Sequence, residues 1–218
     1  ERVAVEGAVR RAGLGGVRVV QTGVGKDAII AKLNQEVQTS PPWLCILAGC
    51  CGALGDVGDV PPIARVIDER GNAWTPTLAD AAGVTLIAMD RVVSTPADKR
   101  ALGTRTGAVI VDMEAHAFAA ACDSMTLAWT VVRGVSDTPE ETLPSEVLGW
   151  ITPSGDTKIG PAVRDLILRP ALIPHIAGVL RRSRRVLPQV GARVVEIVRW
   201  YQEAVEAAGR SAALGARP

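Results

Sequence analysis

Two short runs of β-branched residues, each leading into an acidic residue, constrain the fold of this chain more than any other feature. The first run covers residues 109–114 and the second covers residues 131–137. Residues 115–122, between them, are rich in alanine and apolar enough to form a helix. Strand, helix and strand in this order predict a β-α-β unit with parallel strands, whose carboxyl ends lie at one edge of the sheet. We therefore expect Glu114 and Asp137 to face a common ligand crevice.

Length, charge and composition narrow the class of protein. The chain has 218 residues, of which 48% are hydrophobic, and this is ample for the core of a single α/β domain spanning residues 1–218. The formal net charge of +1 gives no strong field that would attract nucleic acid. One Phe and one Tyr supply too few aromatic platforms for stacking on single strands. A nucleic-acid partner is therefore not expected.

The cysteines and histidines give no sign of a metal site. Four cysteines occur without C-x-x-C spacing, and only two histidines are present, so neither zinc nor a disulfide framework is indicated. Buried thiols of a reducing compartment are the simpler interpretation. The chain shows neither an uncharged membrane-spanning run nor an apolar leader. We expect a cytoplasmic protein without a membrane span or a metal.

Strands and helices are expected to alternate along the chain. The pattern predicts strands at 16–20, 44–48, 57–60, 64–68 and 84–89, and a helix at 26–37. A second helix should begin after Thr95, which is a suitable N-cap, with Pro96 at its first position. Residues 140–158 are predicted to form a long loop, and residues from 159 onward to be mostly helical with interruptions at Pro170, Pro174 and Pro188.

Two glycine-rich segments support different hypotheses. Gly23, Gly25 and Ala28 satisfy G-x-G-x-x-A after a predicted strand, which is the dinucleotide-binding fingerprint. The next predicted strand ends without the acidic residue that holds the ribose, so a dinucleotide-binding oxidoreductase is the less favoured alternative. Gly49 and Gly52, predicted to form a turn after the most apolar strand, would let a ligand approach the backbone.

The motifs occur in an order that resembles a known family. In chain order they are Thr22-Gly-Val-Gly-Lys26, Ala48-Gly-Cys-Cys-Gly52 with Val57-Gly-Asp59, Val111-Asp-Met-Glu-Ala115 and Arg133-Gly-Val-Ser-Asp137. This order resembles the purine nucleoside phosphorylase and uridine phosphorylase superfamily, most of all the 5′-methylthioadenosine/S-adenosylhomocysteine nucleosidases. The resemblance implies a three-layer α/β/α sandwich around a mixed, partly barrel-like sheet.

The resemblance also implies cleavage of the N-glycosidic bond of a purine nucleoside. Asp137 matches the acid that protonates the purine, and Ser136 would orient it. Glu114 matches the residue that accepts hydrogen bonds from the ribose, and Met113 the residue that packs on the sugar. The residues expected to support the substrate or to lie next to it are Gly49, Cys50 and Arg133. No cofactor is implied, although phosphate is a conceivable co-substrate, and a homodimer or a larger homo-oligomer is expected.

Some features depart from the family pattern and leave alternatives open. The usual first strand, which helps to bind the attacking water or phosphate, is not recognisable in residues 1–16, and Glu6 is the acid considered for that role. Hydrolysis and phosphorolysis therefore both remain open, as does a non-catalytic nucleoside-binding protein. The side chains considered for stacking on the purine are Trp74, Met89, Met113 and Phe118. The basic residues 181–185 are interpreted as a solvated helical face, or as a surface for an anionic partner.

Overall fold

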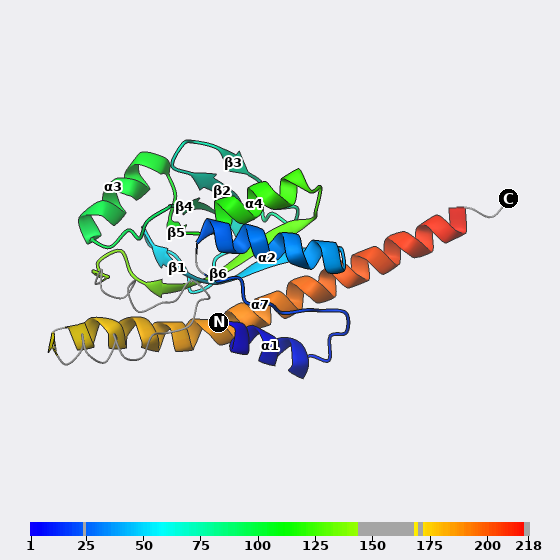
Figure 1. Ribbon diagram of the computed structural model, residues 1–218, viewed down its shortest axis with the longest axis horizontal. Coiled ribbons are helices and arrows are strands. Elements are labelled where there is room, and N and C mark those ends of the chain that lie inside the picture. The colour runs from blue at the N-terminus through cyan, green and yellow to red at the C-terminus, as the bar shows by residue number, and fades with distance from the viewer. Residues whose placement is uncertain (24, 144–167, 170–171, 216–218) are drawn as a thin grey trace.

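The computed structural model describes residues 1–23, 25–143, 168–169 and 172–215 (Figure 1). Within these ranges the helices are α1 (Arg2–Arg11), α2 (Lys26–Thr39), α3 (Pro96–Thr106), α4 (Ala115–Ser124) and α7 (Leu172–Gly215). The strands are β1 (Cys45–Ala53), β2 (Ile63–Asp68), β3 (Ala73–Trp74), β4 (Val84–Ala88), β5 (Ile110–Asp112) and β6 (Trp129–Asp137).

The described strands form one mixed sheet of six in the order β3-β2-β4-β5-β1-β6. The pairs β2/β4, β4/β5 and β1/β6 are parallel, whereas β2/β3 and β1/β5 are antiparallel. Helices occur between the strands along the described chain and before and after them. The fold is therefore α/β with a mixed central sheet, as the sequence predicts.

The prediction that β5 and β6 run parallel is wrong. Both strands pair with β1, which lies between them, but β5 pairs antiparallel and β6 parallel, so the two strands run in opposite directions. The pattern of strand, helix and strand identified the elements correctly, but it does not encode an intervening strand from earlier in the chain. Gly52 of β1 is nevertheless opposite Val111 on one side and Asp137 on the other. The ends of β5 and β6 thus meet across β1.

Helices cover the β1–β6 part of the sheet on two faces (Figure 1). Alternate residues of β1, among them Cys45, Leu47 and Cys51, pack in a core with Ile29 of α2 and Phe118 of α4. The intervening residues Ile46 and Ala48 pack against a separate cluster that includes valines of α1, β6 and α7. All nine residues of β6 are buried. The period of two along β1 thus separates two helical layers.

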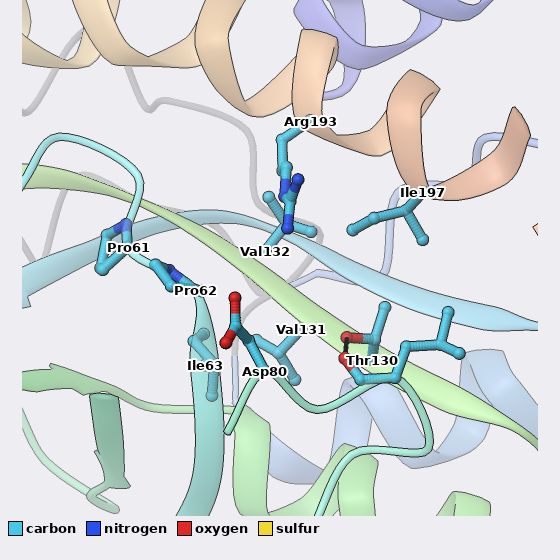
Figure 2. Close-up of a pocket in the computed structure, with 10 residues that line it drawn as sticks. Pro61, Pro62, Ile63, Asp80, Thr130, Val131, Val132, Arg193 and Ile197 are labelled. Carbon is cyan, nitrogen blue, oxygen red and sulfur yellow. Dashed lines mark hydrogen bonds between the residues drawn. The ribbon is translucent and has the colours of Figure 1, made fainter. Parts of the chain in front are cut away.

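Glycine allows α7 to approach β6 closely. A Cβ atom at Gly134 would lie 2.8 Å from the Cγ2 of Val186 and 2.9 Å from the Cγ2 of Val190, so no larger residue fits without movement. Farther along α7, Arg193 and Ile197 point toward β6 (Figure 2). The cavity beneath them is only about 30 Å³, enough for roughly one water molecule. This interface is therefore nearly closed.

Several element predictions are confirmed. The helix predicted at 26–37 is α2, the strands predicted at 64–68 and 84–89 are β2 and β4, and the helix predicted at 115–122 is α4. Thr95 caps α3, because its side chain accepts a hydrogen bond from the backbone N–H of Asp98. Most of the loop predicted at 140–158 lies outside the described residues.

Other element predictions are wrong. Residues 16–20 and 57–60 are irregular, since neither segment has a strand partner in the described structure. The dinucleotide fingerprint at Gly23 therefore lacks the strand that it requires. Residues 49–52 continue β1 instead of turning, and their glycines make room for side chains of the neighbouring strands, as described below. Pro188 lies inside α7 and does not end it.

Across the described ranges, no helix has the combination of length and apolar character needed to span a membrane.

Candidate active site

A cavity of about 1290 Å³ opens beside β1, and it is larger than the 300–1,000 Å³ typical of small-molecule pockets. Residues of β1, the ends of β5 and β6, the start of α1 and the segment before α2 line it. The predicted site residues that line the cavity are Cys50, Met113, Glu114, Arg133, Ser136 and Asp137. The fold thus brings together side chains that come from three separate parts of the sequence.

Asp137, at the end of β6, is buried and held by two donors. Lys99 of α3 donates from Nζ to its Oδ2 at 2.5 Å. The Ser136 hydroxyl lies 3.2 Å from Oδ1 and 3.1 Å from the carbonyl of Cys51, so these two acceptors share its single proton. Both carboxylate oxygens lie close to Gly52, where a Cβ atom would be 2.9 Å from Oδ2. Burial raises the pKa of Asp137 above its ordinary value, although Lys99 opposes this shift. The Asp137 carboxyl is therefore fixed in place and more readily protonated than an exposed aspartate.

Arg133 joins two carboxylates at the cavity wall. Its Nε and Nη2 donate to Oδ2 of Asp112 at 2.9 and 2.5 Å, and Nη2 lies 3.4 Å from Oε2 of Glu114. Burial alone would lower the pKa of Arg133, but the carboxylates of Asp112, Glu114 and Glu1 outweigh burial and raise it. Arg133 therefore stays charged, and its side chain organises the site from within the fold.

Glu114 lies between β5 and α4, at the N-terminus of α4, and lines the cavity. Its Oε1 accepts a hydrogen bond from the backbone N–H of Gly25 at 3.3 Å, next to the first turn of α2. Burial raises the pKa of Glu114, and the neighbouring Asp112 adds to the shift, while Arg133 opposes it. Glu114 is thus a partly desolvated carboxyl group that lines the cavity.

Glu1 is a site residue that the sequence did not indicate. Its Oε1 accepts a hydrogen bond from the backbone N–H of Cys50 at 2.7 Å. Glycine at position 49 makes this contact possible, because a Cβ there would lie 3.1 Å from Oε1 of Glu1 and 2.5 Å from Nη1 of Arg133. Glu6, the acid considered for this role, instead lies on α1 and faces Arg2 at 3.9 Å. No local signal marked Glu1, since its contacts are to residues about fifty or more positions away.

Lys99 is a second residue that sequence analysis missed. It lies on a short helix rich in polar residues, where a lysine is expected to face solvent. The Lys99 side chain is instead fully buried, and within the described part of the chain it donates to Asp137 and two backbone carbonyls. Its role depends on how α3 packs, which the sequence pattern does not report.

The thiols near the site are neutral. Burial raises the pKa of Cys50 to about 12, and the nearby Glu1 carboxylate contributes to the shift. Burial likewise raises the pKa of Cys51. Neither thiol is therefore a ready nucleophile.

Apolar side chains complete the wall. Met113 and Phe118 line the cavity, and the Phe118 ring meets the Trp129 ring edge-on at 6.1 Å. Met89 and Trp74, also considered for stacking on a purine, do not line it; Met89 is buried in a separate core cluster and Trp74 packs against the main core.

Two further features of the sequence have clear places in the structure. Within the basic run, Arg182 contacts the carbonyl of Ser136 and pairs with Glu141, and Arg185 pairs with Asp59, so these two arginines bind within the molecule. Among the described residues, no group of three or more His, Cys, Asp or Glu side chains is placed to hold a metal ion.

The charges of the site define what it can do. Arg133 is matched by Asp112, and Lys99 is matched by Asp137, which leaves Glu1 and Glu114 as further carboxylates near Arg133. Elsewhere the cavity wall also carries the cations Arg2, Arg18, Lys32 and Arg91. The part of the cavity beside Glu1 and Glu114 suits a group that gains positive charge during reaction. A buried carboxyl with a raised pKa beside it is suited to donating a proton.

One segment of the chain matches the model of a known family. Residues 75–160 match the model of the phosphorylase superfamily. This match includes the motif residues Met113, Glu114, Ser136 and Asp137, and it confirms the resemblance read from the sequence. No curated protein sequence matches the chain.

Solved structures agree in fold at low sequence identity. The 5′-methylthioadenosine/S-adenosylhomocysteine nucleosidase of Helicobacter pylori is 12% identical, with a TM-score of 0.64 over 91% of this chain and 94% of that one. The 5′-methylthioadenosine nucleosidase of Arabidopsis thaliana is 13% identical, with a TM-score of 0.57 over 85% and 72%. Futalosine hydrolase of Helicobacter pylori is 11% identical, with a TM-score of 0.59 over 81% and 76%. At these identities the likeness shows the fold.

Proposed function

We propose that the chain hydrolyses the N-glycosidic bond of an adenosine-type purine nucleoside. The observation that carries this proposal is the convergence of three carboxyl groups, those of Glu1, Glu114 and Asp137, on one cavity. Glycosidic cleavage needs a proton for the leaving base and negative charge beside the sugar as it becomes an oxocarbenium ion. The three carboxyl groups supply both requirements.

Asp137 is the proposed general acid. Burial raises its pKa, so it retains a proton at a higher pH than an ordinary aspartate does. It would donate this proton to a ring nitrogen of the purine as the bond between base and sugar breaks, so that the base leaves as a neutral molecule. Ser136 holds the carboxyl from its Oδ1 side and restricts its rotation.

Glu114 is the proposed ribose ligand. A carboxylate that accepts hydrogen bonds from the sugar hydroxyls becomes a stronger partner as the ring gains positive charge, and it therefore stabilises the transition state more than the ground state. Gly25 and Arg133 hold Glu114 from two directions. Met113, which precedes it, supplies an apolar wall for the sugar.

We favour water over phosphate as the nucleophile because of the local charge. The carboxylates of Glu1 and Glu114 are in excess near Arg133, whose guanidinium is already paired with Asp112. A phosphate dianion would be repelled there, whereas Glu1 has lone pairs left to accept a proton from water. Protonation and charge stabilisation both come from side chains, so the step requires neither a metal nor an organic cofactor.

Methylthioadenosine and S-adenosylhomocysteine are the first substrates to consider. The structural neighbours named above include nucleosidases whose names specify these compounds. A cavity of about 1290 Å³ also leaves room beyond a nucleoside for a 5′ substituent.

The test is release of free base from methylthioadenosine, S-adenosylhomocysteine, adenosine and inosine, each with and without phosphate. We expect release without phosphate, with kcat about 10²–10⁴-fold lower in Asp137→Asn and in Glu1→Gln. The matched control is Glu6→Gln, an acid of the same helical segment that faces Arg2, which should leave kcat unchanged.

Other outcomes would decide between the alternatives. A strict requirement for phosphate would show phosphorolysis and contradict the charge argument. Stabilisation by adenosine in a thermal-shift assay, without base release from any substrate, would identify a non-catalytic nucleoside-binding protein.

A homo-oligomer also remains our proposal. Val3, Trp43 and Trp200 are large apolar side chains with 77%, 72% and 58% of their surfaces exposed. The Tyr201 hydroxyl donates to the carbonyl of Trp43, so the part of α7 that carries Trp200 lies beside Trp43. Burial of such side chains against a second copy would be favourable. Light scattering should give at least twice the mass of one chain.

A further inference from the structure

The strongest feature that the proposed reaction does not yet use is the buried ammonium group of Lys99. Lys99 lies on α3, outside every motif discussed above, and has an exposed fraction of 0%. A charged lysine is rarely buried completely unless its environment satisfies it, because removing the charge from water is unfavourable.

All three N–H donors of Lys99 have acceptors. They are Oδ2 of Asp137 at 2.5 Å, the carbonyl of Thr138 at 2.7 Å and the carbonyl of Glu141 at 3.0 Å. No donor in the described structure approaches Nζ, so the geometry is that of an ammonium ion. The two carbonyls belong to the turn that follows β6, and they fix Nζ independently of the carboxylate.

We propose that Lys99 is a positioning residue for Asp137, and that it sets both the orientation of this carboxyl group and the pH range in which the group can act. The inference rests on the proposed function of Asp137. Lys99 itself lies behind the carboxyl group and does not line the cavity, so it acts through Asp137.

The orientation follows from the contacts around Asp137. Lys99 from α3 holds Oδ2, Ser136 from β6 holds Oδ1, and Gly52 from β1 leaves room for both oxygens. Rotation of the carboxyl group would break the bond from Lys99 to Oδ2, and it would also remove Oδ1 from the Ser136 hydroxyl, whose proton Oδ1 shares with the Cys51 carbonyl. One lone pair on each oxygen remains for a ligand or a proton.

The pH range follows from the charges that face Asp137. Lys99 favours the ionised form, while burial favours the protonated form. The other groups nearby are Glu141, Cys51 of β1, and Arg182 of α7, which contacts the Ser136 carbonyl and pairs with Glu141. Since Arg182 and Glu141 offset each other, Lys99 is the principal charge that opposes burial. Removal of Lys99 should therefore let Asp137 keep its proton to a higher pH.

The test compares Lys99→Met, Lys99→Gln and Lys99→Arg with the wild type. If Asp137 acts as an acid, activity is lost as the pH rises through its pKa. In both neutral variants the alkaline limb of the profile of kcat against pH should therefore move to higher pH by about 1–3 units. Their maximal kcat should fall by up to about 10²-fold with KM less affected, because the carboxyl is no longer held. Lys99→Arg, which keeps the charge, should retain the position of the limb.

The matched control is Arg100→Met, which removes a cation from the exposed neighbouring position on α3. It should change neither the limb nor kcat. If Lys99→Met folds poorly, Lys99→Gln, which keeps an N–H donor, provides the neutral comparison. The proposal would be overturned if the alkaline limb of the kcat profile stayed at the same pH in a folded neutral variant. It would also be overturned if Lys99→Arg moved this limb as far as Lys99→Met does.

A second measurement does not depend on activity. In protein labelled with ¹³C at aspartate carboxyls, the resonance lost in Asp137→Asn identifies Asp137, and its titration should move to higher pH in Lys99→Met. This shift without base release from any substrate would support the role of Lys99 while refuting the proposed function. Base release without any change in titration or limb would refute the role of Lys99 alone.

Discussion

Replacing Arg133 by Met should destabilise the fold strongly, because Arg133 neutralises the carboxylates of Asp112 and Glu114 at the cavity wall. The side chain of Arg133 is 4% exposed and that of Asp112 is 2% exposed, and their closest contact is 2.5 Å. Truncating one partner of a buried ion pair costs about 3–5 kcal/mol, since the other partner is left as an unpaired buried charge. For a chain of this size, that loss corresponds to a fall in Tm of about 6–20 °C.

Urea unfolding followed by circular dichroism measures this loss directly. The midpoint should fall while the m-value stays constant, as expected if only the native state is destabilised. Lowering the pH should reduce the difference between variant and wild type. Arg133 opposes the upward shift in the pKa of Glu114, so in the variant Glu114 takes up a proton at a higher pH and relieves the unpaired charge.

Two control variants sharpen the measurement. Arg184→Met removes an exposed arginine of α7 and should change the free energy of unfolding by less than about 0.5 kcal/mol. Arg133→Lys keeps the charge but loses the planar guanidinium group, and its free energy of unfolding should lie between those of the wild type and Arg133→Met. A loss below about 1 kcal/mol in Arg133→Met, at constant m-value, would refute the reasoning.

Four further predictions can be checked with the same assays. Gly134→Ala should cost about 1–3 kcal/mol in urea unfolding, because its methyl group would meet Val186 at 2.8 Å; the loss should diminish when Val186→Ala is added. Gly52→Ala should reduce kcat for base release with a smaller effect on the free energy of unfolding, since its Cβ would lie 2.9 Å from Oδ2 of Asp137. A kcat equal to that of the wild type would show that Asp137 has room to move. Thr95→Ala should cost about 0.5–2 kcal/mol through loss of the α3 cap. Burial raises the pKa of Glu114, so the contribution of this carboxyl to stability falls as the pH rises from its ordinary value through the raised one; the Tm of Glu114→Gln relative to wild type should accordingly rise with pH in that window.

Local sequence patterns predicted those parts of the fold that depend on neighbouring residues. The helix α3 was predicted from Thr95 and Pro96, because capping and a fixed φ act within one turn. Strand β6 and helix α4 were predicted from composition and periodicity. Glu114, Ser136 and Asp137, which the motif order singled out, all line the cavity, and their chemical roles stay predictions.

The structural roles of two glycines were predicted wrongly, because a glycine can be required for different reasons. Gly49 and Gly52 were expected to form a turn, yet both lie in β1 and leave space for the side chains of Arg133 and Asp137. Sequence alone does not distinguish a glycine required for its backbone angles from one required for its missing side chain.

The sequence by itself determined the α/β class, most of the helices and strands, and the two acidic positions that follow β5 and end β6. Only the tertiary structure decided that β1 lies between β5 and β6, that Glu1 reaches the backbone of Cys50, and that Lys99 is buried against Asp137. The physical reason is the separation along the chain. Caps and periodicity act over a few residues, whereas Lys99 and Asp137 are 38 residues apart and Glu1 and Cys50 are 49 apart. Such contacts exist only after the helices have packed on the sheet.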